Sequence, residues 1–227
     1  MNKQLLDGNY EHNVWLKLID DFSLSSKKVE QLQAYARLLI EWNEKFNLTA
    51  IIDPIGIAEH HFYDSLALAR YIDFMAVSCT ADIGTGAGFP GLPLKILFPH
   101  LTVILIEVNA KKRAFLEHVI QELGLENIII YPFDWRSFLR GTTYSIDYFF
   151  ARASLQPEEL VRVFRPSSPY QQSVLVYWAS QQWVAGKHEA LYKEKEERYR
   201  VGDVDRKYIF FRKQPNSLPS TGSGRTG

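Results

Sequence analysis

Cysteine is almost absent from this 227-residue chain, which contains only Cys79. A single thiol excludes a disulfide framework and any zinc site built from several cysteines, and it is typical of a reducing compartment. The sequence also lacks an apolar run of about 18 residues, so no transmembrane helix is expected. Residues 1–11 are polar and lack the apolar core of a signal peptide. We therefore expect a soluble cytoplasmic protein that does not contact a membrane.

Net charge is absent as well, since 26 basic side chains balance 26 acidic ones. The balance is uneven, because residues 151–227 hold thirteen Lys or Arg against eight Asp or Glu. A basic C-terminal third is compatible with an anionic partner and equally with a solvated surface. With 46% hydrophobic residues, the chain has enough apolar material for one sizeable domain. This composition excludes a disordered chain, a collagen-like chain and a coiled coil.

Two kinds of pattern follow one another along the chain. Before residue 76 the apolar residues recur at spacings of three and four, which predicts helices, including one that runs from about Val29 to Phe46 and one at 57–72. From residue 77 onward, short apolar runs alternate with helical patterns. The predicted strands are 77–83, 101–107, 127–131, 145–151 and 173–179. Such alternation predicts a doubly wound, mostly parallel α/β sheet with helices on both faces.

The expected boundaries follow from these patterns. We expect a helical segment at 1–75, an α/β domain at 76–213 and a disordered tail at 214–227, which is rich in Pro, Ser and Gly. Within the α/β domain, residues 199–211 predict a hairpin around Gly202 and Asp203.

The strongest functional signal is the segment DIGTGAGFPG at 82–91, where the first strand meets its helix. Ligands of open α/β sheets bind at this edge, and glycines let the backbone turn sharply and approach a ligand. The spacing Gly86-x-Gly88-x-x-Gly91 matches the dinucleotide fingerprint, with Glu107 placed as a ribose-binding acid. S-adenosylmethionine is the other ligand class that a glycine turn and an acid at the second strand's end can hold.

Charge favours the methyl donor over the dinucleotide. A pyrophosphate needs free N–H groups at a helix N-terminus and no nearby anion. Asp82 lies two residues before Gly84, where its carboxylate would repel a phosphate but can hold the cationic amino-acid end of a sulfonium ligand. Pro90 also removes one N–H donor near the helix start. A methyltransferase is therefore preferred, and an NAD(P)-dependent oxidoreductase is the alternative.

Several blocks of sequence occur together in this chain. They are WNEKFNLTAI at 42–51, HFYDSLAL at 61–68, the run from ADIGTGAGFPG to GLENI at 81–128, and ARASL at 151–155. In this order they resemble the RsmG family, also called GidB, whose members methylate N7 of a guanine in bacterial 16S ribosomal RNA. The resemblance covers residues 38–155 and implies a class I, Rossmann-like methyltransferase fold. It also implies S-adenosyl-L-methionine as cofactor and 16S rRNA or the small ribosomal subunit as partner of a monomeric enzyme.

The resemblance implies cofactor-binding residues position by position. Gly84, Gly86 and Gly88 fall on the donor-binding turn, and Phe89 is expected against the ligand. The other expected cofactor residues are Asp82, Glu107, Trp135 and Arg136 on the loop after the third strand, and Arg152. Arg152, at the end of the fourth strand, is also the expected catalytic residue.

The sequence departs from the family pattern in two places. Family members usually have Glu where this chain has Arg136, so Asp134 is an alternative partner for the adenine. The fifth strand ends in Trp178-Ala179-Ser180, where the family usually has L-K-G. The missing lysine adds a third interpretation, a catalytically altered module that binds donor and RNA.

Three groups of residues are candidates for RNA contact. One is a set of basic residues in the C-terminal third, namely Arg162, Arg165, Arg198, Arg200, Arg206 and Lys207. Lys111, Lys112 and Arg113 oppose the dipole at a helix start, which favours phosphate contact, with a solvated helix start as the alternative. The expected target pocket is lined by Asn47, Thr49, His61, Asp64 and Ser65. For His61 and Asp64, a helix-packing hydrogen bond is an equal alternative. No metal is expected, because the adjacent histidines at 60 and 61 point to different helix faces.

Overall fold

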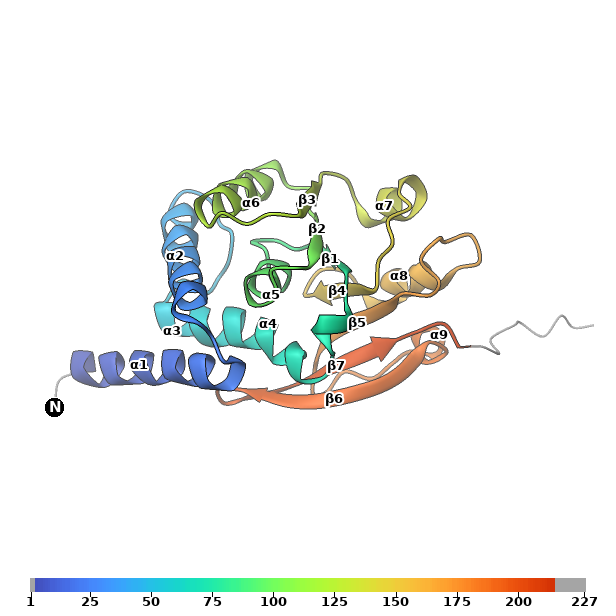
Figure 1. The fold of residues 1–227 in the computed structure, drawn as a ribbon. Coiled ribbons are helices and arrows are strands. Elements are labelled where there is room, and N and C mark those ends of the chain that lie inside the picture. Colours follow the sequence, from blue (N-terminus) through green and yellow to red (C-terminus); the bar gives the residue numbers. More distant parts are fainter. Residues whose placement is uncertain (1–2, 215–227) are drawn as a thin grey trace, which may run out of the picture.

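The computed structural model describes residues 3–214, and the predicted disordered tail lies outside this range apart from its first residue. Seven strands of this range form one sheet in the order β3-β2-β1-β4-β5-β7-β6 (Figure 1). Their bounds are Cys79–Ile83 for β1, Thr102–Ile106 for β2, Ile128–Tyr131 for β3, Tyr148–Arg152 for β4, Val174–Ser180 for β5, Lys193–Val201 for β6 and Val204–Phe211 for β7.

Strand direction separates the sheet into two parts. Strands β1 to β5 pair in parallel, while β7 is antiparallel to both β5 and β6. The five predicted strands and the predicted C-terminal hairpin are thus confirmed, and the hairpin extends the same sheet. The strand order reverses between β1 and β4, so the ligand-binding switch point lies at the carboxyl ends of these two strands.

The N-terminal helices are α1 (Lys3–Phe22) and α2 (Ser26–Asn43). In α2, Leu32, Ala36 and Leu39 are buried, which confirms the predicted apolar stripe. A third helical run comprises α3 (Pro54–Gly56), the π-helical η1 (Ile57–Tyr63), α4 (Asp64–Leu66) and the 3₁₀ segment η2 (Ala67–Arg70), with η3 (Phe74–Ala76) after it. The predicted helix at 57–72 is present, but its first part has π geometry, which is rare and often marks functional sites.

The crossover helices cover both faces of the sheet. They are α5 (Gly91–Leu97), α6 (Ala110–Glu122), α7 (Trp135–Gly141), α8 (Pro157–Leu160), η4 (Val161–Phe164) and, before the hairpin, α9 (Lys187–Ala190). Helix α7 corrects the prediction of a loop after the third strand. Asp134 caps this helix by accepting the N–H of Ser137 at 2.7 Å, a short-range signal that the sequence contained.

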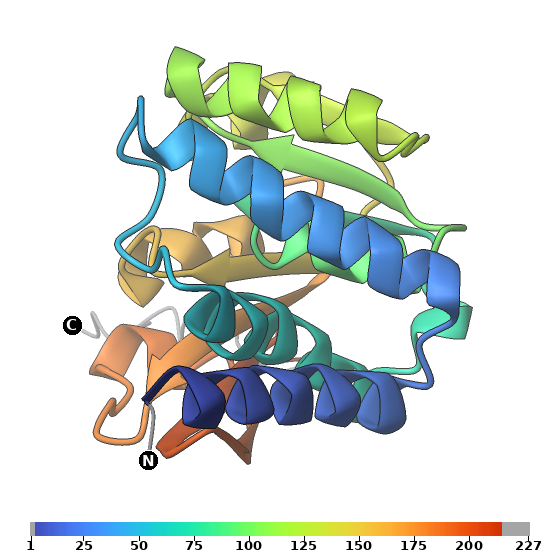
Figure 2. The same ribbon diagram turned by 90° about the vertical axis from the view of Figure 1, so that its left-hand side faces the viewer.

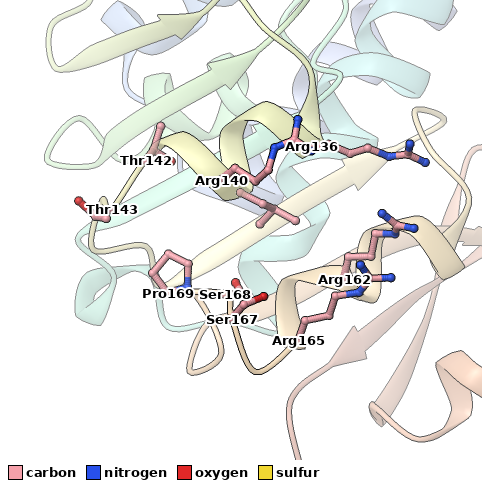
Figure 3. Close-up of a pocket in the computed structure, with 10 residues that line it drawn as sticks. Arg136, Arg140, Thr142, Thr143, Arg162, Arg165, Ser167, Ser168 and Pro169 are labelled. Carbon is pink, nitrogen blue, oxygen red and sulfur yellow. The ribbon is translucent and has the colours of Figure 1, made fainter.

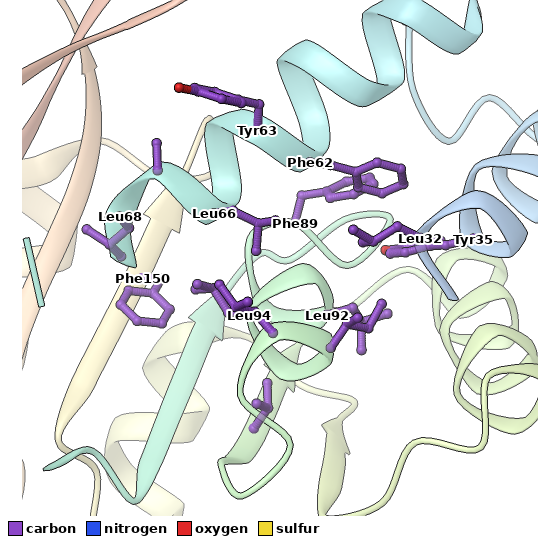
Figure 4. Packing of buried hydrophobic residues seen from close by; sticks show 14 of the residues in the cluster. Leu32, Tyr35, Phe62, Tyr63, Leu66, Leu68, Phe89, Leu92, Leu94 and Phe150 are labelled. Carbon is purple, nitrogen blue, oxygen red and sulfur yellow. The ribbon is translucent and has the colours of Figure 1, made fainter. Parts of the chain in front are cut away.

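Two hydrophobic clusters fill the two sides of the sheet. One joins α2, the π-helical run and α5, as the packing of Leu32, Phe62 and Leu92 shows (Figure 4). The N-terminal helices lie as a layer over this side (Figure 2). The other cluster holds Phe138 of α7 and Val163 of η4. The first cluster crosses the predicted boundary at residue 75, so the helical segment packs directly on the sheet; the boundary itself stays a prediction.

Within residues 3–214, no helix combines the length and the apolar character that crossing a bilayer requires.

Candidate functional site

The glycine-rich turn connects β1 to α5 at the switch point of the sheet. Gly84, Gly86 and Gly88 have φ angles of 63°, 62° and 97°, a region that favours glycine. A Cβ at Gly88 would lie 2.7 Å from Cδ1 of Leu92 and would also meet the Tyr35 hydroxyl. Gly88 is therefore required by packing against α2 and α5, independently of any ligand.

Gly86 differs from its neighbours because its surroundings are open. The nearest atoms to a Cβ there would be the Gly84 carbonyl oxygen and Nζ of Lys112, both at 4.0 Å. The Gly86 N–H donates to Oε2 of Glu107 at 3.0 Å, and Oε1 of Glu107 accepts the Asn109 N–H at 2.8 Å. Glu107 thus ties the end of β2 to the turn, and Gly86 keeps space free beside it.

Asp82 lies under this turn and is 1% exposed. Its Oδ2 accepts hydrogen bonds from Thr85 Oγ1 at 2.7 Å and from the Gly91 N–H at 2.8 Å. Its Oδ1 is buried and has no hydrogen-bond partner among the described residues. Burial raises the pKa of Asp82 to about 6, against the lowering effect of these hydrogen bonds. One oxygen of the Asp82 carboxylate therefore has unused hydrogen-bonding capacity in the buried space under the turn.

The same contacts disfavour a pyrophosphate at this turn. Helix α5 begins at Gly91, whose N–H already donates to Asp82, and the preceding Pro90 has no N–H to offer. The helix N-terminus that binds a pyrophosphate in dinucleotide sites is thus occupied by an internal anion. This geometry supports the sequence argument against the oxidoreductase.

Arg152, at the end of β4, forms a buried ion pair with Asp64. Its Nη1 lies 3.0 Å from Oδ2 of Asp64 and also donates to the His60 carbonyl oxygen, while Nη2 donates to Nδ1 of His61 at 3.2 Å. The Arg152 side chain is 13% exposed and that of Asp64 is 1% exposed. The guanidinium also lies over the Phe89 ring, 5.2 Å from its centroid. Arg152 at the end of β4 therefore contacts His61 and Asp64 of the helical run, all three of which were predicted site residues.

Asp64 is held in turn by the hairpin side of the sheet. Its Oδ1 accepts from Tyr199 Oη at 2.6 Å, and its carbonyl oxygen accepts from Trp178 Nε1 at 3.3 Å and Tyr208 Oη at 3.1 Å. Arg206 Nε lies 3.8 Å from the same carboxylate. Of these β5, β6 and β7 residues the sequence indicated only Arg206, as a candidate RNA contact. Together they hold the Asp64 carboxylate, which in turn positions Arg152.

His61 packs in this cluster as a neutral ring. It stacks on Phe89 with ring centroids 4.4 Å apart, and its Nε2 lies 2.9 Å from Thr49 Oγ1. Burial, followed by the charge of Arg152, lowers the pKa of His61 to about 3. The other face of Phe89 stacks on Tyr35. Both faces of Phe89 are therefore covered by rings of the protein, and its expected contact with the ligand stays a prediction.

The residues expected in the target pocket are only partly accessible. Ser65 is 0% exposed and donates to the His61 carbonyl oxygen at 2.5 Å, and Asp64 is buried in its ion pair. Both side chains are therefore engaged within the protein, and their expected contact with RNA stays a prediction. Asn47 is exposed and Thr49 is half-buried. The loop that carries them is ordered by Asn43, whose Oδ1 accepts the N–H groups of Leu48 and Thr49.

The three cations at the start of α6 have different environments. Arg113 donates to the carbonyl oxygens of Glu107 and Val108, so it anchors its own chain. Lys111 lies over the Phe46 ring, 5.3 Å from the centroid, and is exposed. Lys112 is half-buried beside the glycine turn. Of the three, the two lysines are free to meet an anion.

The side chains of Trp135 and Arg136 both contact Glu159. Trp135 is 3% exposed, and its Nε1 donates to the Glu159 carbonyl oxygen at 3.3 Å. Arg136 forms an ion pair with the Glu159 carboxylate at 2.8 Å. Both side chains therefore join α7 to α8, and their expected contact with the cofactor stays a prediction. A backbone contact at the start of α7 stays a prediction.

Three features at this edge of the sheet were not signalled by the sequence. Ala153 has a φ of 51°, an uncommon conformation for a residue with a Cβ, and Ser154 Oγ is buried without a partner among the described residues. A hollow of about 1020 Å³ also adjoins the Asp64 cluster, lined in part by Trp178, Gln181 and Arg206. The strained backbone and the unpartnered hydroxyl thus lie just after β4, and the hollow lies at the carboxyl end of β5.

In residues 3–214, no set of three His, Cys, Asp or Glu side chains is arranged to hold a metal ion.

Comparison with known proteins supplies an independent finding. The family model described as "GidB: rRNA small subunit methyltransferase G" matches residues 28–209. The Ribosomal RNA small subunit methyltransferase G of Geobacillus kaustophilus is 46% identical over 145 residues, which cover 63% of this chain and 61% of that protein. The match thus spans about three fifths of the length of this curated relative.

Solved structures match at the level of the fold. A human methyltransferase 10 domain containing protein gives a TM-score of 0.55 at 14% identity, covering 80% of this chain and 96% of that chain. A mutant of MtNAS in complex with S-adenosylmethionine gives a TM-score of 0.51 at 16% identity, covering 82% and 73%. These likenesses confirm the predicted Rossmann-like α/β fold.

Proposed function

The chain belongs to the rRNA small subunit methyltransferase G family, and on this basis we propose that it transfers a methyl group from S-adenosyl-L-methionine to N7 of a guanine in 16S ribosomal RNA. The observation that carries the proposal is the glycine turn with the unpartnered carboxylate oxygen of Asp82 under it. An anionic acceptor fits the cationic amino group of a sulfonium amino acid and would repel a phosphate.

The residues at the turn fit this cofactor. Asp82 would accept a hydrogen bond from the amino group, and Glu107 has lone pairs left for the ribose hydroxyls, since each of its oxygens accepts one backbone N–H. Gly86 leaves room for the ligand where a side chain would fill it. When bound, S-adenosylmethionine supplies a methyl group on a positively charged sulfur.

The acceptor atom explains why the site needs no base. Guanine N7 carries an in-plane lone pair and no proton, so its attack requires only alignment with the methyl group. Proximity and alignment alone contribute up to about 7–11 kcal/mol in ideal cases. The buried, neutral His61 is consistent with this chemistry, because its pKa of about 3 makes it a packing group rather than a base at neutral pH.

Arg152 is the residue we assign to the transfer centre. It cannot pair with both O6 and N7 of the guanine during the reaction, because N7 must remain free. We assign it to O6, to a neighbouring phosphate or to the donor's carboxylate. The buried Asp64 acts as a positioning residue, since it holds Nη1 of Arg152 at 3.0 Å. The guanine would enter from the hollow beside Trp178 and Arg206.

The proposed partner is 16S rRNA, free or within the small ribosomal subunit, and the proposed enzyme works as a monomer in the cytoplasm. Asn47, Thr49, Lys111 and Lys112 remain the proposed RNA contacts near the donor, because their side chains are exposed or half-buried.

A methylation assay tests this function. The chain is incubated with isotopically labelled S-adenosylmethionine and either small ribosomal subunits or deproteinised 16S rRNA that lack the modification. Mass spectrometry of the digested RNA then maps 7-methylguanine. We expect one labelled guanine. Donor binding without any labelled RNA would support the altered, non-catalytic module instead.

A further inference from the structure

A basic cleft lies on the side of the sheet that the N-terminal helices do not cover. It has a volume of about 620 Å³ and opens between α7 and the η4 segment (Figure 3). Arg136 and Arg140 line it from α7, and Arg162 and Arg165 line it from η4 and the residue that follows η4. None of the glycine-turn residues lines this cleft.

The positive charge of the cleft is only partly compensated. The Glu159 carboxylate pairs with Arg136 at 2.8 Å and with Arg162 at 2.9 Å. No carboxylate of the described residues forms an ion pair with Arg140 or Arg165, and both are exposed. Asp134, at the start of α7, is a second carboxylate near the cleft, and its charge acts on Arg136 and Arg140 without a direct ion pair. Four guanidinium groups thus face two carboxylates, in a chain with no net charge. Like charges gathered on one surface repel each other, so an anion bound there is stabilised by all of them.

The cleft is also held in shape from both sides. Both oxygens of the Glu159 carboxylate accept hydrogen bonds from Arg136, and one of them also pairs with Arg162. The Glu159 carbonyl oxygen accepts from Trp135 at the start of α7. These contacts join α7 to α8, so the two walls keep their spacing. An arginine fixed in this way loses less side-chain entropy when it binds a phosphate bidentately.

The remaining lining residues define what kind of anion fits. They are Leu139, Thr142, Thr143, Ser167, Ser168 and Pro169. No aromatic side chain lines the cleft, so a base has no ring on which to stack. No acidic side chain lines it to accept from the amino group of a base. The cleft therefore suits phosphate oxygens and sugar hydroxyls rather than a nucleobase.

We propose that this arginine cleft binds the phosphodiester backbone of the ribosomal RNA substrate and positions it for transfer at the separate glycine-turn site. Contacts of this kind set orientation and affinity without reading sequence. The inference rests on the proposed function, since it takes RNA as the substrate.

The test replaces the two unpaired arginines, Arg140→Gln with Arg165→Gln. Both side chains are exposed and make no ion pair, so the fold should be retained, as circular dichroism and thermal unfolding would verify. The matched control is Lys27→Gln with Arg37→Gln, which removes the same charge from exposed positions on α2. Methyl transfer to small subunits gives kcat and KM. Filter binding of deproteinised 16S rRNA between about 50 and 200 mM salt gives the salt dependence of affinity.

We expect the cleft variant to raise KM by roughly tenfold with kcat within about twofold, and to reduce the slope of log affinity against log salt by about one to two. The control should match the wild type. If the wild type transfers methyl groups and the cleft variant equals the control, the cleft assignment is overturned alone. An increased KM on subunits with unchanged binding of bare rRNA would assign the cleft to a ribosomal protein and also overturn it. Absence of transfer by the wild type would overturn the proposed function itself.

Discussion

Two clusters of arginine and carboxylate in this protein use the same chemistry in opposite surroundings. Arg152 and Asp64 are 13% and 1% exposed, whereas Arg136 is 58% exposed beside Glu159 at 21%. The first pair lies among tyrosines and a tryptophan that satisfy the remaining oxygens of Asp64. The second lies in an open cleft with arginines that have no acidic partner. Burial therefore fixes geometry in one cluster, while exposure keeps charge available in the other.

The buried and the exposed ion pair should differ strongly in how much each contributes to the free energy of unfolding. Asp64→Asn leaves Arg152 buried without a countercharge, so we expect the free energy of unfolding to fall by about 3–5 kcal/mol. Glu159→Gln removes an exposed partner and should cost about 0–1 kcal/mol. Urea denaturation of both variants measures the difference. Equal losses would show that the two ion pairs do not differ in the way their exposure indicates.

A second pair of variants separates backbone strain from loss of ligand space. Gly86→Val and Gly124→Val place a side chain at φ angles of 62° and 59°, with no atom closer than 4.0 Å to the Cβ at Gly86 and none within 4 Å at Gly124. Both should lose about 1–2 kcal/mol of stability. Only Gly86→Val should weaken binding of S-adenosylhomocysteine, by roughly a hundredfold. Calorimetry decides, and equal donor binding by both variants would remove Gly86 from the site.

Replacing one arginine by lysine in each cluster tests how much that arginine contributes to methyl transfer. Arg152→Lys keeps the charge beside Asp64 but loses the planar donor set, so methyl transfer should fall by about tenfold or more. The Lys variant is preferable to Arg152→Ala, which would leave Asp64 buried without its partner. Arg162→Lys, in the exposed cluster, should change kcat by less than about twofold. Wild-type turnover by the Arg152 variant would exclude a role in transfer.

The smallest expected effect concerns the pH dependence of the buried cluster. His61 has a folded pKa of about 3, below its unfolded value, so the unfolded chain takes up a proton between about pH 6.5 and 3 that the folded chain does not. Stability should therefore fall as pH falls through this window.

The comparison with His61→Gln isolates this proton. Relative to that variant, the wild type should lose about 0.8 kcal/mol of stability between pH 7.5 and 6.0. Urea denaturation at the two pH values measures the change, and Asp82 and the other titrating groups are common to both proteins. If the stability difference between the wild type and His61→Gln is the same at both pH values, then His61 is protonated as readily in the folded chain as in the unfolded chain.

The parts predicted well from the sequence depend on local patterns. The strands, the glycine turn and the C-terminal hairpin follow from periodicity and turn residues within a few positions of each other. Helix α7 was missed although Asp134 caps it, because its seven residues are too few for a clear period. The π geometry of η1 depends on how the helical run packs, which no local pattern encodes.

The parts that escaped prediction depend on contacts between distant segments. Ser65 is polar in sequence, yet its burial follows from the packing of the helical run. Phe89 is covered by Tyr35 and His61, which come from two other helices. The arginine cleft joins α7 to η4 across β4, so the sequence shows four separate arginines rather than one surface. The spacing of residues along the chain does not show which distant segments pack together.

The most direct test of the central claim is a calorimetric titration of the wild-type chain with S-adenosylhomocysteine and, separately, with NAD. The claim is that Asp82 selects the cationic amino group of a sulfonium amino acid over a pyrophosphate. One carboxylate oxygen of Asp82 is buried without a partner, and the other accepts a hydrogen bond from the first N–H of α5. The account predicts micromolar binding of S-adenosylhomocysteine and no heat with NAD. Tight binding of NAD with no binding of S-adenosylhomocysteine would contradict it.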